Sequence, residues 1–180
     1  MAWLWLLIAL IAVVVIVGIA MRTARARRTA SLRDRFGPEY DRRVDQVGDR
    51  RAGEAELRDV TKRREHLEVR PLTDAARARF AERWLAVQSN FVDQPDRAVA
   101  EADGLVGEVM RERGYPVDDF DERIDMVAVD HPAVAEHYRA GHAMYLRNEQ
   151  RMASTDDLRE ALLHYRTLFE DLLEPSPTSR

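Results

Sequence analysis

The feature that most constrains this chain is residues 2–21, which carry no charge and nothing more polar than the indole N–H groups of Trp3 and Trp5. Twenty residues of α-helix extend about 30 Å, which matches the hydrocarbon core of a bilayer. The sequence therefore predicts one transmembrane anchor, from Ala2 to Met21, that tethers the rest of the chain to a membrane.

A cleaved signal peptide is the alternative to an anchor. Only Met1 precedes the apolar run, so the basic start of a secretory signal is missing, and the run exceeds the usual apolar core of such a signal. A basic cluster follows it, and the positive-inside rule keeps such a flank in the cytoplasm. We expect a single-pass protein of the cell (inner) membrane, with its N-terminus outside and its folded part in the cytoplasm. The membrane-proximal basic cluster is Arg22, Arg25, Arg27 and Arg28.

The basic cluster has two interpretations. It can act only as a topology determinant, as in any anchored cytoplasmic protein. It can also recruit anionic lipid headgroups, which are attracted by four to eight basic residues beside a membrane span. The sequence alone does not separate these two roles.

Charge is unevenly distributed along the rest of the chain. Residues 22–70 hold fifteen basic and ten acidic residues, a net charge of +5, whereas residues 71–180 hold thirteen and twenty-two, a net charge of −9. An acidic distal part is repelled by phosphate backbones, so we expect no nucleic-acid partner. The chain has no cysteine, which excludes disulfides, thiolate nucleophiles and cysteine metal sites.

Apolar spacing predicts an all-α protein with no strand pattern. Residues 22–70 are expected to form a basic juxtamembrane segment and a charged helical connector. This segment contains a short helix over 31–36, a break at Gly37-Pro38 and another bracketed by Gly48 and Gly53. Over residues 54–69 we expect a solvated helix or short coiled coil, whose apolar residues are Leu57, Val60 and Leu67.

A compact bundle of about five helices is expected over residues 71–174, followed by a disordered tail over 175–180. Thr73 is a plausible N-cap for the first of these helices. The helix from Pro95 to Gly114 is the expected centre, because it combines a wide apolar face with a second stripe of small residues. That stripe is Ala100, Gly104 and Gly107, and it predicts close approach by another helix.

Histidine and tyrosine side chains provide the only cluster of chemically versatile residues. His131 and His142 lie about 16 Å apart along one helix, too far to share a metal ion. No catalytic, cofactor or metal motif is present, so we expect none of these functions. The pocket candidates are Tyr138, His142 and His164, with His131, His137, Tyr145 and Tyr165 nearby in the pattern.

Three turn-rich stretches occur in order along the chain: LRDRFGPEYDR at 32–42, RGYPVDDF at 113–120 and VDHP at 129–132. Together they resemble a group of bacterial proteins of high-GC lineages that carry one N-terminal hydrophobic segment and a helical cytoplasmic domain. The resemblance implies this architecture and brings no assigned activity, cofactor or active residue.

These patterns favour a non-enzymatic, membrane-tethered cytoplasmic module that binds a protein partner. The alternative is an enzyme or small-ligand binder that uses a pocket lined by the histidines and tyrosines. Convergence of several histidines on an open pocket would favour the alternative, and their burial would argue against it.

Overall fold

The computed structural model describes residues 2–116 and 118–174, without the side chains of residues 2, 4–12 and 14. Every regular element in this part of the chain is an α-helix, which confirms the predicted all-α class. The predicted disordered tail, residues 175–180, lies outside the described residues. The helices are α1 (Ala2–Phe36), α2 (Pro38–Val47), α3 (Arg50–Glu65), α4 (Asp74–Asn90), α5 (Pro95–Arg113), α6 (Phe120–Asp130), α7 (Pro132–Glu149) and α8 (Thr155–Leu173).

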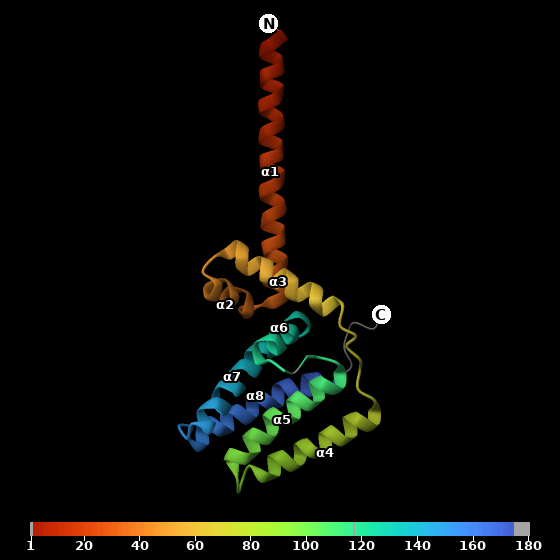
Figure 1. The fold of residues 1–180 in the computed structure, drawn as a ribbon, viewed down its shortest axis with the longest axis vertical. Coiled ribbons are helices and arrows are strands. Elements are labelled where there is room, and N and C mark those ends of the chain that lie inside the picture. Colours follow the sequence, from red (N-terminus) through yellow and green to blue (C-terminus); the bar gives the residue numbers. More distant parts are fainter. Residues whose placement is uncertain (1, 117, 175–180) are drawn as a thin grey trace.

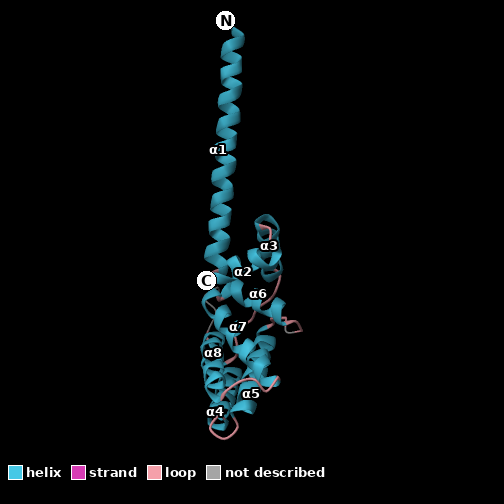
Figure 2. Ribbon diagram, turned by 90° about the vertical axis from the view of Figure 1, so that its left-hand side faces the viewer, coloured by secondary structure: helices cyan, strands magenta, loops and turns pink. Residues whose placement is uncertain are grey.

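Helix α1 is a rod of 35 residues, most of which projects from the folded body (Figure 1 and Figure 2). It continues without a break through residues 31–36, so the prediction of a separate short helix there is wrong. Its final turns are held by the core, in which Leu32 and Phe36 are buried. The predicted break follows at Gly37, whose φ of +53° favours glycine, and Pro38 begins α2.

The predicted anchor, residues 2–21, forms the first part of α1. Among the described residues, no helix combines the length and the apolar character needed to cross a bilayer. Most side chains of residues 2–14 lie outside that described set. The anchor therefore stays a prediction.

Helices α2 and α3 form a hairpin beside the end of α1 (Figure 1). Helix α2 ends at Gly48, which has a φ of +73°, and Asp49 caps α3 by accepting a hydrogen bond from the Ala52 amide at 2.8 Å. Gly53 lies inside α3, so the predicted break is shorter than expected. A Cβ atom added at Gly53 would lie 3.1 Å from the Cα atom of Val44. This glycine therefore allows the two helices to cross closely.

The prediction of a solvated helix over residues 54–69 is wrong for one face of α3. Leu57 and Val60 are 1% and 2% exposed, and both belong to the hydrophobic core that includes the bundle. Helix α3 packs against α6 as well as α2. Residues 38–65 therefore contribute two helices to the folded body.

Helices α4 to α8 form a bundle (Figure 1). Thr73 caps α4, as predicted, by accepting a hydrogen bond from the Ala76 amide at 3.1 Å. Helix α5 ends at Gly114, whose φ is +92°. Helix α5 packs against α4, α7 and α8, and its Val106 and Met110 side chains are fully buried. This helix is the centre of the bundle that its apolar face indicates.

The predicted stripe of small residues on α5 does not mark the closest helix approach. A Cβ atom added at Gly104 would have nothing within 4 Å. The tight contact lies instead between α7 and α8, where a Cβ at Gly141 would meet the Tyr165 ring at 3.3 Å. The small residues of α5 therefore do not mark the tightest packing of the bundle.

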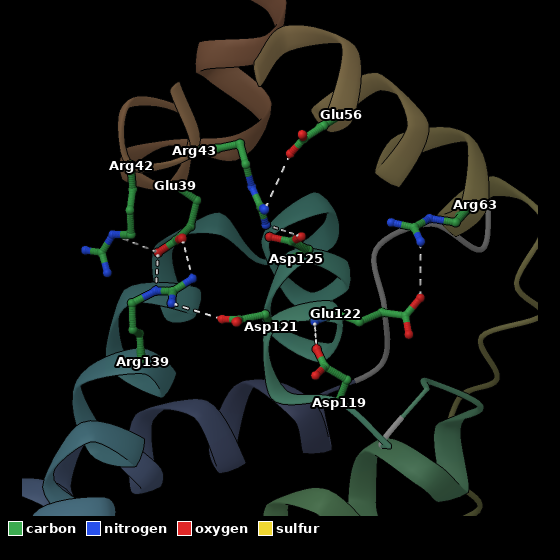
Figure 3. Close-up of polar contacts among 10 residues, drawn as sticks. All are labelled: Glu39, Arg42, Arg43, Glu56, Arg63, Asp119, Asp121, Glu122, Asp125 and Arg139. Carbon is green, nitrogen blue, oxygen red and sulfur yellow. Dashed lines mark hydrogen bonds and ion pairs between the residues drawn. The ribbon is translucent and has the colours of Figure 1, made fainter. Parts of the chain in front are cut away.

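Ion pairs join α2 and α3 to α6 and α7 (Figure 3). Glu39 is only 4% exposed and accepts hydrogen bonds from Arg139 at 2.8 and 3.3 Å. Arg43 donates a hydrogen bond to Asp125 and lies 3.6 Å from Glu56. Burial raises the pKa of Asp125, and the hydrogen bond from Arg43 opposes that rise. These pairs hold the N-terminal hairpin in one position on the bundle.

Candidate functional site

A cleft of about 580 Å³ lies between α1 and α3. Its lining residues recur every three or four positions on each helix, so each wall is one helical face. Seven basic and only two acidic side chains line it, which gives the cleft a net charge of +5. The basic residues are Arg25, Arg28, Arg35, Arg50, Arg51, Arg58 and Lys62.

Glu54 links the walls of the cleft to the hairpin. Its carboxylate accepts hydrogen bonds from Thr29 of α1 at 2.8 Å and from Tyr40 of α2 at 3.0 Å. Burial and the Glu54 carboxylate both raise the pKa of Tyr40, so its hydroxyl remains a donor at neutral pH. These bonds join three helices and fix the separation of the two walls.

Two of the cleft arginines have acidic partners, both at long distance. Arg35 lies 3.9 Å from Glu65, and Arg50 lies 3.9 Å from Glu54. Exposed pairs of this kind contribute at most about 1 kcal/mol. Lys62 similarly lies 3.5 Å from Asp59. Among the described residues, four of the seven basic side chains of the cleft are left without a carboxylate partner.

The remaining cleft arginines have no such partner in the part of the chain that the structure describes. Among the described residues, no acidic side chain forms an ion pair with Arg25, Arg28 or Arg51. Arg58 donates to the Glu54 carbonyl oxygen at 2.9 Å rather than to a carboxylate. Guanidinium groups present paired N–H donors that match the geometry of carboxylate and phosphate. The chemistry of the cleft is therefore that of an anion site.

The structure divides the predicted basic cluster. Arg25 and Arg28 line the cleft, whereas Arg22 and Arg27 lie elsewhere on α1 and do not. Sequence reasoning missed the α3 wall, including Arg51. The helical spacing of its basic residues indicates that they share one face of α3. The sequence does not show that this face lies toward α1, because that depends on the fold.

The predicted pocket residues Tyr138 and His142 belong to a polar cluster between α5, α7 and α8. Asp103 of α5, which sequence reasoning missed, is its centre. The Asp103 carboxylate lies 3.1 Å from the His142 Nδ1 atom and accepts a hydrogen bond from Tyr165 at 2.9 Å. Arg123 of α6 donates to the Tyr138 hydroxyl at 2.7 Å.

The phenols of this cluster are enclosed, whereas the His142 and Asp103 side chains are 17% and 18% exposed. Tyr138 and Tyr165 are fully buried, and burial raises the pKa of both phenols. Phe120 stacks on the His142 ring with 3.8 Å between ring centroids. The hydrogen bonds of Asp103 and Tyr138 link α5, α6, α7 and α8, so the arrangement stabilises the junction of these helices.

His164 lies apart from His142 and pairs with His137, with 2.9 Å between their Nδ1 atoms. Burial and the neighbouring His137 lower the pKa of His164. His131 contacts Asp171 instead, at 2.5 Å. The four candidate histidines thus occupy three separate places. In the described part of the chain, no set of three or more His, Cys, Asp or Glu side chains is arranged to hold a metal ion.

Comparison of the chain with protein families, curated proteins and solved structures finds no match. The resemblance to single-pass proteins of high-GC bacteria therefore stays a prediction.

Proposed function

We propose that this protein is a non-enzymatic interaction module, tethered to the cytoplasmic face of the cell membrane by residues 2–21. The uncharged run and its basic flank support the tether. The observation that carries the proposal is the continuity of α1, which runs from Ala2 to Phe36 and ends in the core. The tether is thus a rigid extension of the folded body.

A rigid tether has a specific consequence for binding. The ten residues 22–31 extend about 15 Å as helix, so the folded body lies at a set height below the membrane surface. The ion pairs between the hairpin and the bundle also set its orientation (Figure 3). Two proteins held at the same membrane have a high effective concentration relative to one another. Because the module is also held in one orientation, it loses less rotational freedom when it binds such a partner.

The alternative, an enzyme or small-ligand binder, has less support from the geometry. Tyr138 and His142 are engaged with protein side chains, and His164 lies in a different cluster. None of these residues lines the cleft between α1 and α3.

Cysteine labelling tests the tether and its orientation. Because the chain has no cysteine, each single-cysteine variant gives one signal. On intact cells, a membrane-impermeant maleimide should label Ala2→Cys, and should label Ala75→Cys, on exposed α4, only after lysis. The reverse pattern would contradict the topology. Release of the protein from membranes by alkaline carbonate would contradict the anchor.

Proximity labelling tests the interaction role. A labelling enzyme at the C-terminus of the full chain should mark a discrete cytoplasmic protein in native membranes. A chain that begins at Thr29 should mark it weakly or not at all. The absence of any discrete partner would contradict the interaction role, and labelling of extracytoplasmic proteins would contradict the orientation.

A further inference from the structure

The α1–α3 cleft holds like charges together across a long sequence separation. Arg28 and Arg51 come from different helices, yet both line one cavity. A topology signal requires basic residues beside the membrane span and does not require a second basic wall from α3. Holding unpaired cations on facing walls also opposes folding, because like charges repel. An anion in the cleft would remove this repulsion.

We propose that the cleft binds the phosphate of an anionic phospholipid headgroup, with arginines of both walls supplying the positive charge. This inference rests on the proposed tether, because the tether brings the cleft to the lipid. The cavity of about 580 Å³ falls within the size range of small-ligand sites. Arg28 of α1 and Arg51 of α3 are one residue from each wall without an acidic partner among the described residues, and their guanidinium groups can bind a phosphate together.

The position of the cleft favours a lipid over other phosphates. Arg25 and Arg28 follow Met21 by four and seven residues, which is about 6 and 10 Å along the helix axis. The headgroup layer begins where the predicted span ends and is roughly 5–8 Å thick. The cleft thus begins near the outer edge of the headgroup layer, within the length of an arginine side chain from the lipid phosphates. A nucleic acid would also approach residues 71–180, whose net charge of −9 repels it.

Site binding differs from general attraction to an anionic surface. General attraction depends on the number of basic residues near the membrane and little on where they point. Arg22 and Arg27 lie close to the predicted span but do not line the cleft, whereas Arg51 lies on α3 and does. The double variants Arg28→Ala/Arg51→Ala and Arg22→Ala/Arg27→Ala remove equal charge and therefore form a matched pair.

The test uses the full chain, purified in a non-ionic detergent, with phosphatidylglycerol and phosphatidylcholine as probes. Native mass spectrometry should show retention of phosphatidylglycerol in preference to phosphatidylcholine. Arg28→Ala/Arg51→Ala should weaken this binding about 25-fold, because each arginine contributes about fivefold. Arg22→Ala/Arg27→Ala should change it by less than about twofold, because neither residue lines the cleft and solvent screens an exposed charge that does not contact the ligand. Circular dichroism of both variants confirms that they are folded.

Three outcomes would overturn the lipid site. Equal weakening by the two double variants would indicate general surface attraction. Competition by glycerol phosphate at the affinity of phosphatidylglycerol would identify a soluble phosphate as the ligand. Tighter binding of a short single-stranded DNA would identify a nucleic-acid site.

The tether is tested separately by carbonate extraction. A protein that resists extraction but shows no lipid preference overturns the cleft alone. A protein that is extracted overturns the tether, while the detergent assay still tests the cleft.

Discussion

Helices α1 to α3 carry charged side chains on two faces, one toward α6 and α7 and the other around the α1–α3 cleft. On the first, which we call the paired face, basic and acidic side chains form ion pairs, whereas the second has an excess of basic side chains. Toward α6 and α7, basic and acidic side chains alternate and pair, as in the contacts of Arg139 with Glu39 and of Arg63 with Glu122 (Figure 3). Toward the α1–α3 cleft, basic side chains gather with few acids. The paired charges thus fix the arrangement of the helices, whereas the unpaired charges remain available for a ligand.

The two faces also differ in burial, which sets the size of the effects expected from mutation. Glu39 is nearly inaccessible, so removing its partner strands a charge in the interior. Arg28 and Arg51 are exposed, and solvent and salt screen their repulsion. Mutations in the paired face should therefore change stability strongly, and mutations in the cleft should change binding while changing stability little.

The largest effect is expected for Arg139→Ala. This substitution leaves the buried Glu39 carboxylate without its main partner, which should lower the free energy of unfolding by about 3 kcal/mol. Urea denaturation of the full chain, followed by circular dichroism, measures it. The double variant Glu39→Leu/Arg139→Leu should recover most of the loss, because neither charge remains. A loss below about 1 kcal/mol would contradict a structural role for this pair.

A smaller effect is expected for Gly53→Ala, which tests how α3 is positioned. The added methyl group meets the Val44 backbone at 3.1 Å and should cost about 1–2 kcal/mol, because backbone has to move. Gly104→Ala is the control, since its methyl group meets nothing within 4 Å. That control should stabilise the protein by about 0.5–1 kcal/mol. Equal thermal unfolding midpoints for the two variants would contradict the close α2–α3 crossing.

The pH dependence of the paired face follows from Asp125, whose pKa burial raises above the ordinary 3.8. An acid with a raised folded pKa contributes stability that is present below its unfolded pKa and is lost as pH rises through the folded pKa. The hydrogen bond from Arg43 limits this loss, so Arg43→Ala should raise the pKa of Asp125 further. NMR titration of the Asp125 carboxyl measures both values. An unchanged or lower pKa in the variant would contradict the pairing.

The smallest stability effect is expected for Arg51→Ala in the cleft. Relief of repulsion should raise the free energy of unfolding by no more than about 0.5 kcal/mol at low salt, and the gain should vanish at high salt. Arg63→Ala is the matched control on the same helix, because it removes a pair with Glu122 at 3.4 Å. That control should lose up to about 0.5 kcal/mol at low salt. Equal losses in the two variants would contradict the difference between the faces.

Local signals predicted the helices well. The cap at Thr73, the turn at Gly37-Pro38 and the end of α5 at Gly114 all follow from the residue at that point and its neighbours. Burial was harder to predict, because Leu57 and Val60 lie in a strongly charged segment. Their partners come from distant helices, and no local pattern reveals them.

The candidate sites show the same limit. Helical spacing correctly placed Tyr138 and His142 near each other, because both lie on α7. It could not place Asp103 or His164, whose positions depend on how α5 and α8 are rotated against α7. The sequence indicated only the α1 wall of the cleft, as the basic cluster that follows the apolar run. Its α3 wall required the hairpin that folds Arg51 back toward α1.

Thermal unfolding of the full chain in zwitterionic micelles, with and without phosphatidylglycerol, tests most directly whether the unpaired charges of the α1–α3 cleft bind an anion. A ligand that binds only the folded state raises the unfolding midpoint. Our account predicts this rise for the natural chain and for Arg22→Ala/Arg27→Ala, and its loss for Arg28→Ala/Arg51→Ala. The same rise in all three proteins, or in none, would contradict an anion site between α1 and α3.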